Sequence, residues 1–181
     1  DISTHSLGGA AGAGAFVANY PVSDTQPTAD APLRLLRTSP HEAVHMLDTR
    51  ARPTWVAESL AAYLPIKSLH RFRLDTTTAA DELVQREDRL PHAKAGLYRA
   101  SDAVKAGDLS YYPLFYVKGS AFWEALDLAL QRHHRTLSAL LPHLSWQEDG
   151  RFDAASSTLL AGTLGAEVWH SLISRYLSEP A

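Results

Sequence analysis

Beyond about residue 35, the apolar residues of this chain recur with a helical period. The spacing predicts eight helices, over residues 40–48, 55–64, 78–89, 97–106, 111–134, 136–144, 153–160 and 165–177. The start of the chain is rich in Gly, Ala, Pro and Thr, and it contains one predicted strand, residues 13–20, followed by a proline-containing loop. Residues 146–152 read as a second loop. We therefore expect a mainly α fold, with an extended segment at 1–35 and a helical region at 36–181.

The predicted helix 55–64 differs from the others because apolar side chains surround it almost completely. A helix of this kind is buried. Glu58 and Ser59 occupy its only narrow polar sector. A buried carboxylate needs a cation or several hydrogen-bond donors nearby, so Glu58 is a candidate ligand. The alternative is that Glu58 reaches solvent through this sector.

Composition fits one globular domain. The chain has 181 residues, of which 45% are hydrophobic and 20% charged, which is enough to form a core. Its formal net charge of -3 gives no basic surface for nucleic acid. No apolar run reaches the length of a membrane span.

The chain contains no cysteine, which excludes disulfides and thiolate metal sites, so any metal would be bound by histidine and carboxylate. The first residue is Asp1 rather than Met. This suggests an exported, processed protein, periplasmic or secreted, or else an excised piece of a longer one.

The sequence His41-Glu42-Ala43-Val44-His45 has the spacing of a zinc hydrolase motif. Residues four apart on a helix are separated by about 6 Å of rise and about 40° of rotation, so His41 and His45 can share one metal ion. Glu42 lies about 100° round the helix, where its carboxylate can act as general base toward a water on the metal. Glu58 is the expected third ligand, which leaves one position open.

Two local features admit other interpretations. Ser39-Pro40-His41-Glu42 also has the pattern of a capping box, with Ser39 as N-cap and Pro40 at the first helical position. Asp48 lies on the same helical face as both histidines but roughly 10 Å along the axis from His41, too far to share one ion. It is expected either to accept a histidine N–H or to pair with a nearby arginine, or to be solvated.

These residues resemble the glutamate-type zincins, or gluzincins. In that family a second motif, commonly Trp-x-x-Glu-Gly-x-Ala-x-Tyr, follows the His-Glu-x-x-His helix, and Trp55 to Tyr63 match it except for Ser59 in place of glycine. Tyr116-Val117-Lys118-Gly119 resembles the Tyr-x-Lys-Gly segment of the related aminopeptidase N and glycyl aminopeptidase families. The resemblance covers roughly residues 36–140. It implies a zincin-like helical catalytic domain, a fragment of a larger α+β metallopeptidase.

The resemblance also implies that the Tyr116 hydroxyl stabilises the oxyanion of the tetrahedral intermediate. The alternative is core packing, because Tyr111, Tyr112, Phe115 and Tyr116 form an aromatic run at the start of a predicted helix. The related aminopeptidases carry a glutamate in an upstream glycine-rich strand that binds the substrate amino group. Residues 8–20 contain the glycines but no acid, which favours peptide hydrolysis without exopeptidase specificity.

The sequence therefore predicts a Zn²⁺-dependent metallopeptidase acting on peptides or proteins, with His41, His45 and Glu58 as metal ligands and Glu42 and Tyr116 as catalytic residues. The alternative function is a non-catalytic domain that binds zinc or a peptide. The remaining histidines lack a metal-ligand partner at suitable spacing in the sequence.

Overall fold

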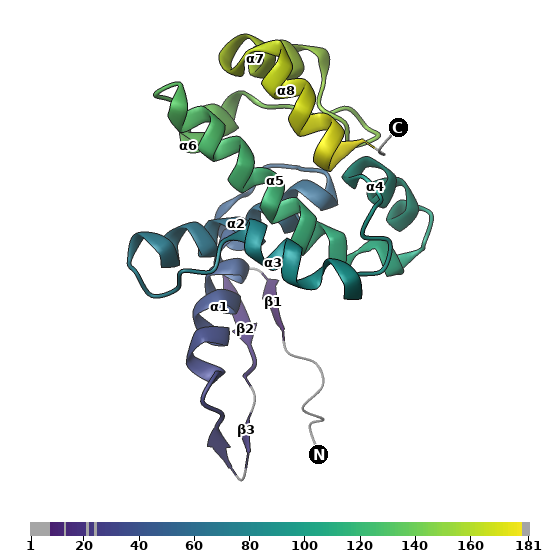
Figure 1. Cartoon of the computed structure of the whole chain (residues 1–181). Helices are drawn as coiled ribbons and strands as arrows, with labels where there is room; N and C mark the ends of the chain where they lie inside the picture. Colours follow the sequence, from purple (N-terminus) through teal and green to yellow (C-terminus); the bar gives the residue numbers. More distant parts are fainter. Residues whose placement is uncertain (1–7, 13, 21, 24, 179–181) are drawn as a thin grey trace. The chain divides into compact units, whose positions relative to one another are not determined.

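The structure is a computed structural model that describes residues 8–12, 14–20, 22–23 and 25–178. The fold is mainly helical, as predicted, and it also contains two small antiparallel sheets (Figure 1). The chain divides into two compact units, one of Asp1–Ala51 with Leu64–Thr76 and the other of Arg52–Tyr63 with Thr77–Ala181. Helix α2 (Thr54–Arg71) begins in the second unit and ends in the first.

The first unit contains two hairpins and a long helix. Strands β1 (Gly9–Gly12) and β2 (Ala15–Ala18) are antiparallel, with Gly9 opposite Ala18. A second hairpin pairs β3 (Val22–Ser23) with β4 (Gln26–Pro27). Helix α1 (Ala31–Leu47) follows, and both β1 and β2 pack on it. Strand β1 can pack closely because it consists only of Gly and Ala, whose side chains are absent or small.

The start of the first helix was predicted wrongly. It begins at Ala31, not at Pro40, and Pro32 occupies the first turn, where a missing N–H costs nothing. Pro40 lies inside α1, so Ser39 is not an N-cap and the capping-box interpretation is wrong. The boundary expected at residues 35–36 also falls inside this helix. Of the predicted strand 13–20, residues 15–18 form β2, residue 14 lies in a turn, residues 19–20 are not in a strand, and residue 13 lies outside the described residues. Strand β1 was not predicted.

The second unit is a helical assembly around α5. Its helices after α2 match the predicted ranges to within a few residues, although some predicted ranges divide into an α-helix and a short 3-10 or π turn. They are α3 (Ala79–Arg86), η1 (Glu87–Arg89), α4 (Leu97–Lys105), η2 (Leu109–Tyr111), α5 (Pro113–Arg132), α6 (Leu137–Leu140), η3 (Leu141–His143), α7 (Ala154–Leu164), α8 (Ala166–Leu172) and the π turn η4 (Ile173–Leu177).

Helix α2 was predicted to end at Leu64, before Pro65, but it continues through that proline to Arg71. A proline inside a helix removes one backbone hydrogen bond. Beyond it, Ile66 and Leu69 are buried, at 6% and 5% exposure. Burial of these two side chains offsets the lost hydrogen bond and keeps the segment helical.

The core of the second unit is aromatic. The rings of Trp55 and Trp123 stack with centroids 6.2 Å apart and 14° between their planes. Phe122 and Phe152 pack edge-on against them. Trp55 lies at the start of α2 and Trp123 in α5, so this cluster fixes the segment of α2 that carries Glu58 relative to α5.

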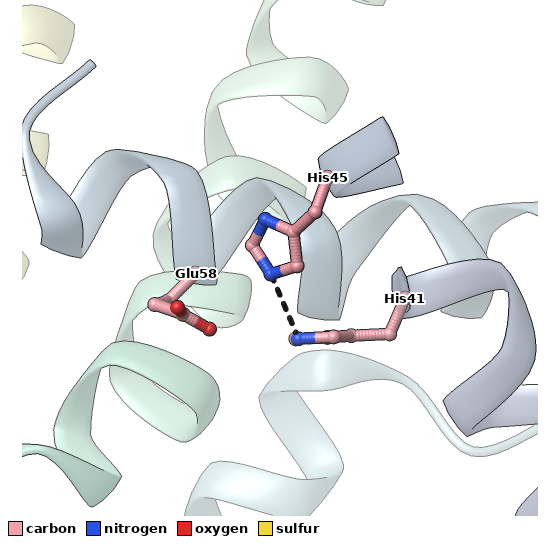
Figure 2. Close-up of side chains that lie close together, drawn as sticks. All are labelled: His41, His45 and Glu58. Carbon is pink, nitrogen blue, oxygen red and sulfur yellow. Dashed lines mark hydrogen bonds between the residues drawn. The ribbon is translucent and has the colours of Figure 1, made fainter. Parts of the chain in front are cut away.

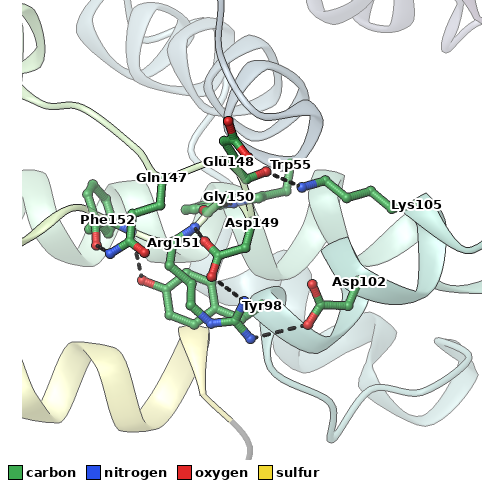
Figure 3. A network of polar contacts seen from close by, with 10 residues as sticks. All are labelled: Trp55, Tyr98, Asp102, Lys105, Gln147, Glu148, Asp149, Gly150, Arg151 and Phe152. Atoms are coloured by element: carbon green, nitrogen blue, oxygen red, sulfur yellow. Dashed lines mark hydrogen bonds and ion pairs between the residues drawn. The ribbon is translucent and has the colours of Figure 1, made fainter.

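The loop around Arg151 makes polar contacts with Trp55 and with residues of α4, as Figure 3 shows. The indole N–H of Trp55 donates to the carbonyl of Gly150 at 2.8 Å. Arg151 pairs with Asp149 at 3.0 Å and with Asp102 of α4 at 3.2 Å, and its guanidinium lies 5.2 Å from the centre of the Tyr98 ring. The predicted loop at 146–152 is thus confirmed, and its polar groups anchor it to α4.

Buried acids on α5 have structural partners. Glu124 accepts the backbone N–H groups of Ala79 and Ala80 at 3.3 and 2.8 Å, at the start of α3. Asp127 accepts the Tyr63 hydroxyl at 2.7 Å and the Leu137 N–H at 3.3 Å. Both carboxylates therefore satisfy helix N-termini or a buried hydroxyl.

Among the helices that the structure describes, none has the length and apolar character of a membrane span.

Candidate metal centre

Helix α1 brings two imidazoles together. His41 and His45 are four residues apart, and their Nε2 atoms lie 3.2 Å from each other. Figure 2 shows the two rings edge to face, with centroids 4.8 Å apart and planes at 77°. Because residues four apart share a helix face, this arrangement follows from the regular helix, and the sequence prediction of a histidine pair is confirmed.

The separation of the two Nε2 atoms fits one tetrahedral ion. Zinc–nitrogen bonds of about 2.0–2.1 Å at tetrahedral angles place two ligand nitrogens roughly 3.3 Å apart. The observed 3.2 Å is close to this value. The same distance also suits a hydrogen bond between a protonated and an unprotonated ring nitrogen. The donor set of the pair is thus compatible with zinc, and binding of the ion would replace that hydrogen bond.

Glu42, the predicted general base, is buried at 6% exposure on the same helix. Strand β1 approaches it closely at Gly9. A Cβ atom added at Gly9 would lie 2.6 Å from both Cγ and Oε1 of Glu42 and 2.8 Å from the carbonyl oxygen of Val17. Glycine is therefore required at position 9 if the Glu42 side chain is to keep its position.

Asp48 marks the end of α1. Its backbone N–H donates to the Val44 carbonyl at 2.8 Å, and its own backbone leaves the helical conformation. This position is consistent with the sequence argument that Asp48 is too far along the axis to be a ligand beside His41. Its proposed contact with a histidine or an arginine remains a prediction.

Glu58 lies in the first turns of α2 and is half-buried. Its Oε1 accepts a hydrogen bond from the Tyr112 hydroxyl at 2.9 Å. Figure 2 draws its carboxylate, which extends from the helix. Within the second unit, the carboxylate of Glu58 therefore accepts a hydrogen bond from an uncharged hydroxyl group. Because this donor carries no positive charge, it does not neutralise the carboxylate.

Ser59, which stands where the gluzincin motif has glycine, is fully buried. Its hydroxyl accepts from the Trp123 indole N–H at 2.7 Å and donates to the Val56 carbonyl at 3.2 Å. Gly119 of α5 faces it, and any Cβ there would collide with the Ser59 Cβ. Gly119 therefore allows α5 to approach α2 closely at this point, and the serine is accommodated by hydrogen bonding.

Tyr116, the predicted oxyanion donor, lies one turn into α5 near the same carboxylate. Its ring centre is 5.6 Å from that of Tyr112, and 37% of its surface is exposed. Loss of solvation, then the negative charge of Glu58 and the neighbouring Tyr112, raise the pKa of Tyr116 well above its ordinary value. Loss of solvation and the charge of Glu58 raise the pKa of Tyr112 to about 12. Both hydroxyls therefore stay protonated at neutral pH and can donate.

Sequence reasoning overlooked Tyr112 as a partner of Glu58 and treated it only as a member of the aromatic run. The available signal was its spacing, because Tyr112 and Tyr116 are four residues apart and so lie on one helical face. Tyr111, its neighbour, behaves differently: its ring stacks on His92, with centroids 3.8 Å apart and planes at 3°. Two neighbouring members of the aromatic run thus lie in different environments, Tyr111 against His92 and Tyr112 against Glu58.

The structure therefore places the predicted site residues in two groups. His41, Glu42 and His45 lie in the first unit, and Glu58 and Tyr116 lie in the second, together with Tyr112.

Searches with models of protein families, among curated proteins and among solved structures found no match to this chain.

Proposed function

We propose that this protein is a zinc-dependent metallopeptidase in which His41, His45 and Glu58 hold one Zn²⁺ ion. The observation that carries the proposal is the histidine pair on α1, whose Nε2 atoms are 3.2 Å apart beside the buried Glu42. Among the described residues, His41, His45 and Glu58 are also the group of His, Asp and Glu side chains that could share a metal ion. Two imidazoles and one carboxylate form a common ligand set of zinc hydrolases.

In this proposal the metal ion and the side chains of the protein have separate roles in peptide hydrolysis. When bound by two imidazoles and one carboxylate, a Zn²⁺ ion would carry a net charge of +1, which would lower the pKa of a water molecule and polarise a substrate carbonyl. Glu42 takes the proton of the attacking water and passes it to the leaving amine. The hydroxyl of Tyr116 donates to the carbonyl oxygen as negative charge develops there. A tyrosine hydroxyl, with an ordinary pKa of about 10, carries this proton at neutral pH.

Strand β1 offers a surface for an extended substrate in this proposal. Its residues Gly9–Gly12 are exposed and small, and β1 packs on the helix that carries Glu42. A peptide can add to such a strand through main-chain hydrogen bonds. Because no acid is present in residues 8–20 to bind a free amino group, internal peptide bonds are the expected substrates.

Removal of the metal tests the proposal directly. We expect the zinc-loaded protein to cleave a pool of unstructured peptides, to lose this activity when a chelator removes the metal, and to regain it with one equivalent of Zn²⁺. Cleavage is measured by mass spectrometry of the pool. A protein that holds one zinc per chain but cleaves nothing would contradict the enzyme and favour a non-catalytic binding domain.

Tyr116→Phe is expected to lower kcat by about a hundredfold while leaving zinc content and fold unchanged, because the lost hydrogen bond forms mainly in the transition state. Steady-state kinetics and zinc analysis measure both effects. Tyr111→Phe serves as the control, since Tyr111 stacks on His92. A loss of the same size in both variants, or a kcat of Tyr116→Phe within a few-fold of the parent, would exclude the oxyanion role.

Gly9→Ala is expected to reduce peptide hydrolysis tenfold to a hundredfold without loss of zinc. The added Cβ would meet Glu42 at 2.6 Å, so the general base has to move by a few tenths of an ångström or more. Gly12→Ala is the matched control on the same strand, because its nearest neighbour, the Ala15 carbonyl oxygen, would be 3.9 Å away. Equal activity in the two variants would show that β1 does not position Glu42.

A further inference from the structure

An open surface cavity lies beside α4, and all the residues that line it belong to the second unit. Its volume is about 540 Å³, within the range of sites for small ligands. Tyr98, Arg99 and Asp102 line it from α4, Arg151 from the loop described above, and Leu177 from η4. The residues proposed for metal binding and catalysis do not line this cavity, so it is a separate candidate site.

The guanidinium group of Arg151 is held in a fixed orientation (Figure 3). Its Nη1 donates to Asp149 at 3.0 Å and its Nη2 donates to Asp102 at 3.2 Å. Its central carbon lies 5.2 Å from the centre of the Tyr98 ring, which attracts a cation. These hydrogen bonds leave other N–H groups of the guanidinium available to donate, and 40% of the side chain is exposed. Arg151 is therefore oriented in advance for a further acceptor.

Arg99 adds a second positive charge to the lining. It is exposed on α4, and no described residue forms an ion pair or a hydrogen bond with its guanidinium group. Among the described residues that line the cavity, Asp102 is the acidic one, and Arg151 already binds its carboxylate. Because a guanidinium group can only donate, this lining fits a ligand that carries a single negative charge on acceptor oxygens.

We propose that this cavity binds a carboxylate group, carried by the end of a peptide chain or by a small organic acid, through the guanidinium groups of Arg99 and Arg151. A planar carboxylate matches the planar guanidinium, and the hydrogen bonds between them are strengthened by their opposite charges. A phosphate dianion fits less well, since its second negative charge would be repelled by Asp102. The proposal does not depend on the metal site, because the cavity lies within the second unit.

The test is an NMR titration of the ¹⁵N-labelled full chain, kept free of zinc by a chelator and at constant ionic strength, since salt screens exposed charges. The probes are N-acetyl-Ala-Phe, its C-terminal amide, benzoate and inorganic phosphate. We expect N-acetyl-Ala-Phe to shift arginine Nε–H signals to saturation, with a Kd on the order of a millimolar. The amide should bind about tenfold more weakly or less, because it lacks the charged acceptor. Benzoate as tight as the peptide would identify small acids as the source of the carboxylate, and a tighter peptide would identify the chain end.

Arg99→Gln should weaken binding of N-acetyl-Ala-Phe about tenfold and leave the fold intact, because Arg99 has no polar partner among the described residues. Arg135→Gln is the matched control: it removes an exposed arginine beyond the end of α5 and should bind as the parent does. The zinc-loaded protein should also bind equally well. Equal affinity for the acid and its amide, tighter binding of phosphate, or unchanged binding in Arg99→Gln would overturn the inference. Binding that requires zinc would also overturn it, because the carboxylate would then lie on the metal ion.

Discussion

His45→Ala is expected to abolish stoichiometric zinc binding. One imidazole and one carboxylate give only two protein ligands, because the substitution removes the imidazole whose Nε2 atom lies 3.2 Å from that of His41. Loss of one of three ligands weakens a zinc site by orders of magnitude because the remaining donors cannot displace enough water from the ion. The measurement is elemental analysis after dialysis against metal-free buffer.

The matched control is His133→Ala. His133 lies just beyond the end of α5 and is exposed, so this variant also removes one imidazole but leaves the proposed ligands untouched. It should keep one zinc per chain. Equal zinc in His45→Ala and the parent would show that the histidine pair is not a metal site.

Glu42→Gln is expected to keep zinc and fold but to lower peptide hydrolysis by about two to four orders of magnitude. Glutamine has the size and helix propensity of glutamate but cannot take a proton from water, so only the chemical step is affected. The pair of measurements is zinc content and kcat/KM on one cleaved peptide.

Glu167→Gln is the control for this substitution, because Glu167 is an exposed residue in the first turn of α8. It should leave both quantities unchanged. Unaltered hydrolysis in Glu42→Gln would remove Glu42 from the mechanism. Zinc loss in the same variant would instead mean that its carboxylate supports the fold of α1 or the metal itself.

The histidine pair was predictable because helical geometry is local. Two residues four apart face the same way in any regular helix, wherever the helix begins. The start of α1 was not predictable by the same reasoning, since Pro32 and Pro40 both have a plausible place in a first turn. The contacts of β1 and β2 with this helix select the earlier start. Packing also explains why α2 does not end before Pro65, because the side chains of Ile66 and Leu69 beyond it are buried.

The partners of Glu58 depended on tertiary structure. The apolar surroundings of Glu58 in the sequence indicated that its carboxylate needs a donor or a cation, but they do not identify Tyr112, which is 54 positions away. That pairing requires α2 and α5 to pack closely, and the packing depends on Gly119 opposite Ser59 and on the Trp55–Trp123 stack. The glycine and aromatic residues in the sequence indicate that two helices can pack closely. They do not identify which side chains make contact.

Anomalous scattering at the zinc edge, from crystals of the zinc-loaded protein, tests the central claim most directly. The account predicts one strong peak per chain, about 2.0–2.2 Å from the Nε2 atoms of His41 and His45 and from one carboxylate oxygen of Glu58. No peak at the histidine pair, or a peak whose third protein ligand is a residue other than Glu58, would contradict it.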